Sequence, residues 1–344
     1  MAKNKKCLIW DLDNTLWDGV LLEGQEVKLK EGMAAIFQEL DRRGILLSVA
    51  SKNDPTDAEA ALKKLGLWDY FLYPQIGWNS KAQSVQAISE ALNIGIDSLA
   101  FIDDQDFERA EVRYHHPDVL TIDAADYQNL TAMPEFIPRF ITEDSRLRRE
   151  MYRSDLNRKA TEAEFSGSSE EFLATLNMEL TIAPVSHGDL ERVEELTIRT
   201  NQLNSTGVTY SFEELESYIS SERHIFLIAS LQDKFGAYGK IGIVLLEENQ
   251  TELRIRLLLM SCRVMTRGIG SALLVHLIKL AQAKNKKLTA DFVHTGRNRV
   301  MYVTYKLMGF EEEDESETEA RQCTLVYKGE ADKDYPPYLD ISLL

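Results

Sequence analysis

Two aspartates separated by one residue follow a short apolar segment near the start of the chain. The segment Cys7–Trp10 predicts a buried strand, and Asp11 and Asp13 lie on the turn that leaves it. In an open α/β sheet, ligands bind in the crevice at the carboxyl ends of the strands. Two carboxylates this close repel each other unless a proton or a cation relieves them, and Mg²⁺ is a hard cation that prefers oxygen ligands. The pair therefore predicts a carboxylate nucleophile beside an acid/base, acting on a phosphate with a metal ion.

Three later segments extend this pattern. A second apolar segment is followed by Ser51–Asn53, a helical pattern begins near Lys81, and a third apolar segment ends in Asp103 and Asp104. A nucleophile, a hydroxyl group, a lysine and an acidic pair therefore occur in this order, each near the end of a predicted element. Any one of these residues alone is better explained as a solvated side chain. The mutually consistent roles of the whole set favour a catalytic site.

This ordered set resembles the haloacid dehalogenase superfamily of aspartyl-phosphate phosphotransferases. The resemblance implies that Asp11 attacks the substrate, and that Asp13 protonates the leaving oxygen and later activates water. It also implies that Ser51 hydrogen-bonds the phosphate and that Lys81 holds the nucleophile and offsets developing charge. The residues that it assigns to Mg²⁺ are Asp11, Asp103, Asp104 and Asp13, the last through its main-chain carbonyl. We assign Thr15 and Asn53 to substrate binding.

Length, charge and cysteine content narrow the class of protein. A chain of 344 residues is long enough for two domains with separate cores. The formal net charge of −17 argues against binding to nucleic acid or to anionic membranes. Cys7, Cys262 and Cys323 are odd in number and show no spacing motif, which predicts reduced thiols in a cytoplasmic protein, with no disulfide framework or zinc site. The apolar segment before Asp11 is too short for a signal peptide or a membrane span.

Alternating strand and helix patterns from residue 6 to about 125 must position the catalytic set. They predict a parallel sheet covered on both faces, in an α/β, Rossmann-like catalytic domain over residues 1–138. Only 39 residues separate Asp11 from Ser51, and 21 separate Lys81 from Asp103. Neither gap can hold a large cap domain, so we expect an open site. The expected strands are 6–10, 45–50, 71–75, 98–102 and 118–122, and the expected helices are about 31–43, 55–65, 80–93 and 106–114.

A charged, helix-prone linker is expected over residues 139–178. Its basic residues cluster between Arg139 and Lys159 on a chain that is otherwise acidic. A solvated linker helix is the preferred interpretation, because runs of charge are usually solvated. The alternative is a basic docking surface for an acidic partner such as an acyl carrier protein.

Residues 179–344 show a different pattern. The segment Glu252–Met260 alternates, with Leu253, Ile255, Leu257 and Leu259 expected on one face, and a loop containing Gly268 and Gly270 then leads into a helix. A strand, a glycine loop and a helix present backbone N–H groups and a helix dipole to an anion such as a pyrophosphate. With the segment Asn298–Phe310, this resembles an N-acetyltransferase (GNAT) fold of the α+β class.

Two residues of this second domain bear on its activity. Met265 stands where the GNAT family usually has Arg or Gln, so the loop is expected to bind a phosphopantetheine pyrophosphate without competent acetyl transfer. Tyr305 lies where such enzymes often keep a general acid, and packing of its ring in the core is an equally good interpretation.

Four strings and the order of the domains resemble FkbH-like proteins over almost the whole chain. The strings are Asp11–Val20, Phe101–Arg109, Arg199–Asn204 and Ser261–Val264. This resemblance implies removal of phosphate from 1,3-bisphosphoglycerate and transfer of the glyceryl unit to the phosphopantetheine thiol of an acyl carrier protein, in polyketide biosynthesis. We assign Arg199 and Asn201 to substrate binding, with a helix cap as the alternative for that string. The alternative function is a Mg²⁺-dependent phosphatase of a small phosphorylated three-carbon acid, with a non-catalytic GNAT-like module.

A covalent glyceryl-enzyme step would need a thiol. Many FkbH-like proteins have Cys just before the serine of the second motif, where this chain has Ala50. Cys7 and Cys323 are expected in apolar strands, where a thiol is inert. Cys262 lies beside Arg263 before the glycine loop, and it is either a relay or, by preference, a small buried residue.

Overall fold

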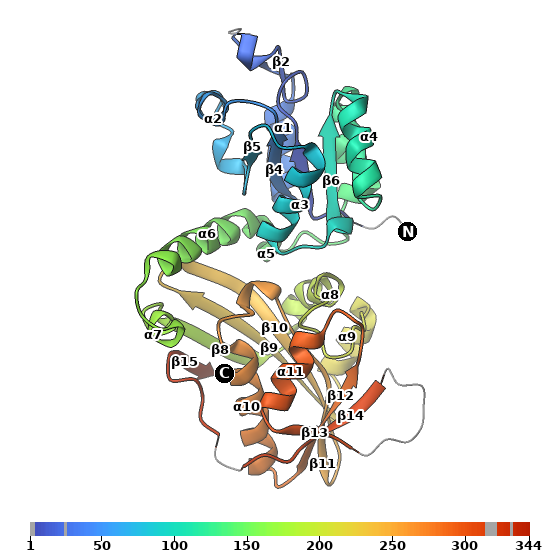
Figure 1. Cartoon of the computed structure of the whole chain (residues 1–344). Helices are drawn as coiled ribbons and strands as arrows, with labels where there is room; N and C mark the ends of the chain where they lie inside the picture. Colours follow the sequence, from blue (N-terminus) through green and yellow to red (C-terminus); the bar gives the residue numbers. More distant parts are fainter. Residues whose placement is uncertain (1–3, 24–25, 314–321, 331–332) are drawn as a thin grey trace. The chain divides into compact units, whose positions relative to one another are not determined.

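The computed structural model describes residues 4–23, 26–313, 322–330 and 333–344. The chain divides into two compact units, Met1–Arg153 and Ser154–Leu344 (Figure 1). Each unit has its own hydrophobic core. Of the helices in the described part of the chain, none combines the length and the apolar character needed to cross a bilayer.

The first unit is built on a five-stranded sheet in the order β5-β4-β1-β6-β7, with every neighbouring pair parallel. Its strands are β1 Cys7–Trp10, β4 Leu46–Ser51, β5 Gln75–Ile76, β6 Leu99–Asp103 and β7 Leu120–Asp123. Its helices are α1 Met33–Arg42, α2 Pro55–Lys64, α3 Lys81–Leu92, α4 Asp106–His115 and α5 Glu143–Arg146. A small hairpin, β2 Trp17–Asp18 with β3 Lys28–Leu29, lies between β1 and α1 in the sequence.

The register of the sheet brings the predicted motifs to one edge. Trp10, the last residue of β1, is level with Val49 of β4 and Ile102 of β6. Because the three strands are parallel, Asp11, Ser51 and Asp103 all lie at their carboxyl ends. One face of the sheet packs against α1 and α2, where the Trp10 and Phe37 rings lie 5.2 Å apart.

Local capping places the helix that carries Lys81. Ser80 has extended backbone and its side chain accepts a hydrogen bond from Gln83 N (3.2 Å), so α3 begins at Lys81. The expected strand at 71–75 is wrong, because only Gln75–Ile76 pairs with β4, although Phe71 forms an isolated bridge with Leu47. Tyr73 has a positive φ of 49° and the next residue is proline, which has no N–H to donate, so the segment cannot continue as a strand.

The second unit contains a mixed eight-stranded sheet in the order β13-β14-β12-β11-β10-β9-β8-β15. Its strands are β8 Met178–Pro184, β9 His224–Asp233, β10 Gly236–Glu248, β11 Glu252–Met260, β12 Lys287–Val293, β13 Phe310–Glu312, β14 Gln322–Tyr327 and β15 Leu339–Leu343. Its helices are α7 Ser169–Ala174, α8 Leu190–Arg199, α9 Phe212–Ile219, α10 Ile269–Ala283 and α11 Arg299–Leu307, and α6 Arg148–Glu164 begins in the first unit. Helices α8 and α9 pack on one face, and α10 and α11 on the other (Figure 1).

A β-bulge interrupts the side-chain alternation that the sequence predicts for β11, so the four leucine and isoleucine side chains do not share one face. The register with β10 shifts between Leu245 and Leu246, which skips Arg256 on β11. Leu253 and Ile255 therefore face the core under α10, whereas Leu257 and Leu259 face α8 and α9. A bulge inserts one extra residue and reverses the side-chain alternation beyond it, which a strict two-residue period cannot anticipate.

Strands β11 and β12 pair in parallel only from Glu252–Ile255 with Lys287–Ala290. Beyond this point, the segment Leu203–Ser205 lies between them. Met260 N donates to Leu203 O at 2.8 Å, and Val293 N donates to Ser205 O at 2.9 Å. The segment therefore satisfies backbone groups of both strands.

The basic residues of the predicted linker are largely engaged within the units. Arg148 donates to Gly44 O at 2.9 Å, Arg149 pairs with Asp41 at 2.9 Å, and Arg153 pairs with Asp69 at 3.1 Å. Arg158 is buried and pairs with Asp233 at 2.7 Å. Two of these four guanidinium groups are buried, so they form no continuous exposed basic face, which favours the linker interpretation.

The buried Arg158–Asp233 pair predicts a stability effect confined to the second unit. Arg158→Ala leaves the Asp233 carboxylate buried without its cation, and we expect a loss of about 3–5 kcal/mol. All four tryptophans lie in the first unit, so tryptophan fluorescence during urea unfolding follows that unit and far-ultraviolet circular dichroism follows both. The second unit's transition should move to lower urea while the fluorescence transition stays. Lys159→Ala, in a pair whose lysine is 50% exposed, is the matched control and should change stability by less than about 0.5 kcal/mol.

Candidate active site

Asp11 lies at the carboxyl end of the central strand and is held on two sides. Its main-chain N donates to Ile102 O at 3.0 Å, which fixes it against β6. Its Oδ1 accepts hydrogen bonds from Ser51 Oγ at 3.0 Å and from Lys81 Nζ. Burial raises the pKa of the Asp11 carboxyl, and contact with Lys81 opposes that rise. The predicted nucleophile, hydroxyl and lysine are therefore in direct contact.

Lys81 is buried and surrounded by carboxylates. Its Nζ contacts Asp11, lies 3.1 Å from Asp103 Oδ2 and 2.9 Å from Glu108 Oε2, and donates to Ala50 O at 2.8 Å. Burial works against its charge, but the three carboxylates outweigh burial and raise the pKa of Lys81. The ammonium group is therefore charged, and it faces three acids.

The effect of this clustered negative charge is seen in the pKa of Asp103. Burial, followed by repulsion from Asp11, raises the pKa of Asp103 to about 7. Its Oδ2 is buried and lies 3.1 Å from the Lys81 ammonium, which Asp11 and Glu108 share. A buried carboxylate that shares its cation with two other acids is in an unfavourable arrangement unless a further cation or a proton completes it.

Three carboxylates fit a divalent cation at this position. One oxygen each from Asp11, Asp103 and Asp104 lies within 4.8 Å of the others. Asp104 is oriented by Thr15, whose Oγ1 accepts a hydrogen bond from Asp104 N at 3.0 Å. All three donors are oxygens, which suits Mg²⁺ better than a softer metal. Thr15 is fully buried and positions Asp104, and its predicted contact with substrate stays a prediction.

The Asp13 side chain is held apart from these three carboxylates. Its Oδ1 accepts from Trp17 Nε1 at 2.8 Å and from Leu21 N at 3.1 Å, and its Oδ2 accepts from Asn53 Nδ2 at 3.0 Å. Only its main-chain carbonyl is left for a metal. Asn53 also donates to Ser51 Oγ at 3.2 Å and is fully buried, so it positions Asp13 and Ser51, and its predicted contact with substrate stays a prediction.

Sequence reasoning missed Glu108. This buried residue contacts Lys81 at 2.9 Å and Lys52 at 2.8 Å. Burial opposes its charge, but Lys81 outweighs it and the pKa of Glu108 is lowered. It lies in the first turn of α4, shortly after the acidic pair, and this position in the sequence could have identified it as a site residue. Its neighbour Arg109 donates to Asp103 O at 2.7 Å and fixes the end of β6.

The predicted binding residues Arg199 and Asn201 lie in the second unit, at the end of α8. Arg199 pairs with Glu195 at 3.1 Å, one turn earlier on the helix, and Asn201 is exposed. The buried amide of the string is Asn204, whose Oδ1 accepts from Gly207 N at 2.8 Å. Asn204 thus has the satisfied amide expected for a helix end, and substrate binding by Arg199 and Asn201 stays a prediction.

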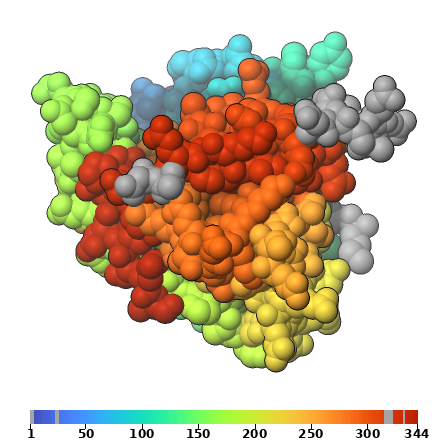
Figure 2. Space-filling view, turned by 90° about the horizontal axis from the view of Figure 1, so that it is seen from below, coloured from blue at the N-terminus to red at the C-terminus, as the bar shows by residue number. Residues whose placement is uncertain are grey.

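The glycine loop of the second unit is covered. Gly268 caps α10 with a φ of 74°, and a Cβ added there would lie 2.3 Å from Tyr338 Oη. A Cβ on Gly270 would lie 3.1 Å from the Met260 methyl group. The carboxyl-terminal segment (dark red in Figure 2) packs along α10, where Lys279 lies over the Tyr335 ring. The positive φ of Gly268 favours glycine at that position, whereas the flexible Met260 side chain could shift away from a Cβ at position 270.

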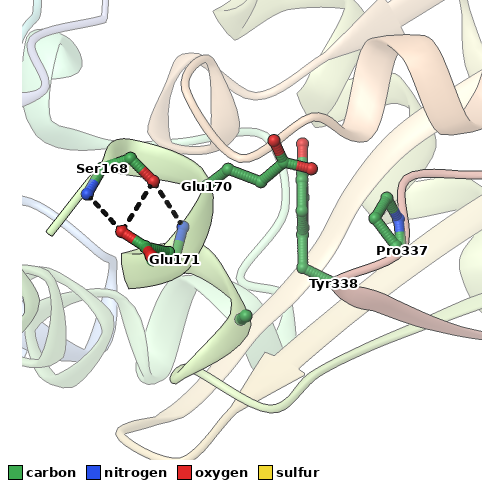
Figure 3. A pocket seen from close by; sticks show the side chains of 6 residues that line it. Ser168, Glu170, Glu171, Pro337 and Tyr338 are labelled. Carbon is green, nitrogen blue, oxygen red and sulfur yellow. Dashed lines mark hydrogen bonds between the residues drawn. The ribbon is translucent and has the colours of Figure 1, made fainter.

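A pocket of about 300 Å³ beside this loop is acidic. It is lined by α7 and by Tyr338, and the Glu170 side chain lies alongside the Tyr338 ring (Figure 3). Glu171 caps its own helix by accepting a hydrogen bond from Ser168 N at 2.7 Å. Acids repel a pyrophosphate, and Tyr338 covers the helix N-terminus. This pocket therefore offers no positive charge to a pyrophosphate, and the predicted role of Gly268 and Gly270 in binding stays a prediction.

Tyr305 and Cys7 are both buried core residues, whereas Cys262 is only half-buried. Tyr305 is fully buried, with its ring 5.0 Å from Phe310 and 6.2 Å from Phe292, and burial raises its pKa. It is a core residue. Cys7 is buried in β1, and burial raises the pKa of its thiol. Cys262 is half-buried in a 3₁₀ turn, Cys262–Val264, before the glycine loop.

Comparisons with known proteins give partial similarities. No protein-family model matches the chain, and no curated protein matches it. Among solved structures, it is similar to the N-terminal part of protein BF1531 from Bacteroides fragilis, which contains a phosphatase domain complexed with Mg, with 34% identity over 39% of this chain and 41% of that chain and a TM-score of 0.35. The chain thus spans about two fifths of that structure.

Two further solved structures are each similar to less than half of the chain. The ribosomal-protein-S18-alanine N-acetyltransferase from Escherichia coli is 18% identical over 43% of this chain and 90% of its own, with a TM-score of 0.33. Ard1 from Thermoplasma volcanium is 18% identical over 44% of this chain and 99% of its own, with a TM-score of 0.33. The parallel α/β first unit and the α+β second unit confirm the fold class predicted from the sequence.

The position of Glu108 predicts a role in holding Lys81. Glu108→Gln should lower the rate of phosphate release by about 10- to 100-fold, the usual effect of removing a group that orients metal-site residues. Glu108→Asp should recover part of the rate. Asp106→Asn removes a charge from the same turn, where the side chain is 78% exposed, and should leave the rate nearly unchanged. Equal losses in the Glu108 and Asp106 variants would mean that general charge, and not contact with Lys81, is responsible.

Proposed function

We propose that the first unit is a Mg²⁺-dependent phosphatase that forms an aspartyl-phosphate. The observation that carries the proposal is the contact of Asp11 with Ser51 and Lys81, next to the oxygens of Asp103 and Asp104. A carboxylate held by a charged lysine and surrounded by further acids matches a nucleophile that works beside a bound cation. The Mg in the similar Bacteroides fragilis phosphatase domain agrees with this proposal.

The residues divide the chemistry between two steps. In the first, a carboxylate oxygen of Asp11 attacks phosphorus while the bond to the leaving oxygen breaks, and Asp13 supplies the proton to that oxygen. In the second, Asp13 takes a proton from water, which attacks the phosphorus and frees Asp11. The hydrogen bonds from Trp17 and Asn53 hold Asp13 in one orientation for both steps. Bound Mg²⁺ would neutralise charge on the phosphate oxygens.

The gaps between the motifs hold little structure that could cover the site. Between β1 and α1, the described residues contain the two-residue strands β2 and β3 and a 3₁₀ turn, Leu21–Glu23. Between α3 and β6 there is one 3₁₀ turn, Ile96–Ser98. Neither insertion is a cap domain. An open site suits a bulky or protein-borne acceptor.

In its finer form, the proposal is that the phosphatase step belongs to a glyceryl transfer. The donor would be 1,3-bisphosphoglycerate, and the acceptor would be the phosphopantetheine thiol of an acyl carrier protein, as in FkbH-like proteins. The four strings that resemble that family support this form, and the open site agrees with it. The carrier thiol, or Cys262 as a relay because Ala50 has no thiol, would attack the acyl carbon of the donor and expel the 1-phosphate. Asp11 would remove the 3-phosphate through the aspartyl-phosphate.

The alternative is a phosphatase of a small phosphorylated three-carbon acid with a non-catalytic second unit. A specific observation favours it: Tyr338 covers the glycine loop, and Tyr305 lies in the core. Neither feature of an acetyltransferase site is therefore available in the second unit.

We expect Asp11→Asn to abolish phosphate release while the fold remains intact. An amide is a far weaker nucleophile, so the rate should fall by roughly 10⁴-fold or more. Release of phosphate from an acyl phosphate donor measures the rate, and circular dichroism checks the fold. Chelation should also stop the wild-type reaction, and added Mg²⁺ should restore it. Wild-type rates in Asp11→Asn, or after exhaustive chelation, would contradict the proposal.

Mass spectrometry of the intact carrier and the intact enzyme tests the proposal of glyceryl transfer. Incubation with 1,3-bisphosphoglycerate, Mg²⁺ and a candidate holo-carrier should give a glyceryl adduct on the carrier, and with Asp11→Asn any adduct should keep the 3-phosphate. Phosphate release without any carrier adduct would favour the alternative. An adduct on the enzyme that is lost in Cys262→Ser would identify Cys262 as the relay, whereas an adduct that persists would exclude it.

A further inference from the structure

Three side chains of metal-binding type gather in the second unit, whereas the aspartates of the candidate active site belong to the first. They are His294, which follows β12, Glu312 at the end of β13, and Cys323 in β14. One ligand atom from each lies within 4.8 Å of the other two. The three residues are far apart in sequence and form no spacing motif, so the fold alone brings them together.

The register of the sheet explains their meeting. Cys323 lies opposite Phe292, and Glu312 lies opposite Leu325. Because side chains alternate along a strand, His294 shares the face of Phe292, and Leu325 shares the face of Cys323. All three candidate ligands therefore project from the same face of three neighbouring strands.

Helix α11 orients two of the three ligands. Tyr302 donates its hydroxyl hydrogen to the Glu312 carboxylate. The His294 ring lies 5.1 Å from the Tyr302 ring and 5.0 Å from the Phe292 ring. Groups that hydrogen-bond or pack against metal ligands fix their orientation, which is a usual feature of built metal sites. Glu312 and Cys323 are half-buried and His294 is exposed, so an ion can enter from solvent.

We propose that His294, Glu312 and Cys323 bind a Zn²⁺ ion. Imidazole, carboxylate and thiolate are the ligands of protein zinc sites, and three protein ligands leave a fourth tetrahedral position for water or a solute. The thiolate and imidazole select a softer ion than the all-oxygen set of Asp11, Asp103 and Asp104. The two units therefore carry metal sites of different chemical preference.

Co²⁺ is a suitable probe because it adopts the same tetrahedral geometry as Zn²⁺ and reports its ligands by absorption. Metal-stripped full-length protein should take up Co²⁺ with a thiolate-to-cobalt charge-transfer band in the near ultraviolet. The aspartate site has only oxygen ligands and cannot produce this band. Zn²⁺ should displace the Co²⁺ and remove the band, since Zn²⁺ binds such ligands more tightly.

Matched variants identify the ligands. Cys323→Ser and His294→Ala should lose the band and bind Zn²⁺ roughly a hundredfold or more weakly, and Tyr302→Phe should weaken binding about tenfold. Cys262→Ser removes the other half-buried thiol and should keep the band. His294 is exposed, so its variant is expected to fold, which circular dichroism checks. Absence of the band in the wild type, or a band that survives Cys323→Ser, would overturn the proposal.

Discussion

The contact of the buried Lys81 ammonium with three carboxylates organises the first unit. An unpaired ammonium at this depth would be strongly unfavourable, and so would Asp11, Asp103 and Glu108 without a cation. The lysine reaches them because Ser80 caps α3 and makes Lys81 its first residue. Lys81 and Lys52, which pairs with Glu108 at 2.8 Å, supply two positive charges, and Asp104 brings the number of clustered carboxylates to four. The same contact that stabilises the site therefore leaves it with an affinity for a further cation.

The residues around this contact act mainly through position. Thr15 orients Asp104, Asn53 joins Asp13 to Ser51, and Arg109 holds the end of β6. Each functional group thus comes from a strand end or a helix start and is held by a second residue. Groups fixed in this way need little reorganisation when charge develops on a phosphate, which is the physical basis of electrostatic catalysis. The short segments between the motifs form no cap domain, so selection of a substrate would depend on surfaces outside the catalytic cluster.

The strand ends could be predicted from the sequence because parallel strands with short apolar segments meet at one edge. Asp11, Ser51, Lys81 and Asp103 each follow or begin an element, so their proximity follows from topology. The roles of Thr15 and Asn53 could not be predicted, because burial of a side chain depends on contacts with residues 40 or more positions away. The bulge at Arg256 was also beyond a pattern that assumes a constant two-residue period.

The second unit shows why a local motif and a binding site can separate. Gly268 is favoured whether or not an anion binds, because its φ of 74° suits glycine and a Cβ there would meet Tyr338. This glycine therefore has a local backbone explanation that is independent of an anion. His294, Glu312 and Cys323 are the opposite case, since they have no motif and are assembled only by sheet register. Short-range residue spacing can therefore predict a loop such as the one at Gly268. A ligand set such as His294, Glu312 and Cys323 becomes visible only when the register of the sheet is known.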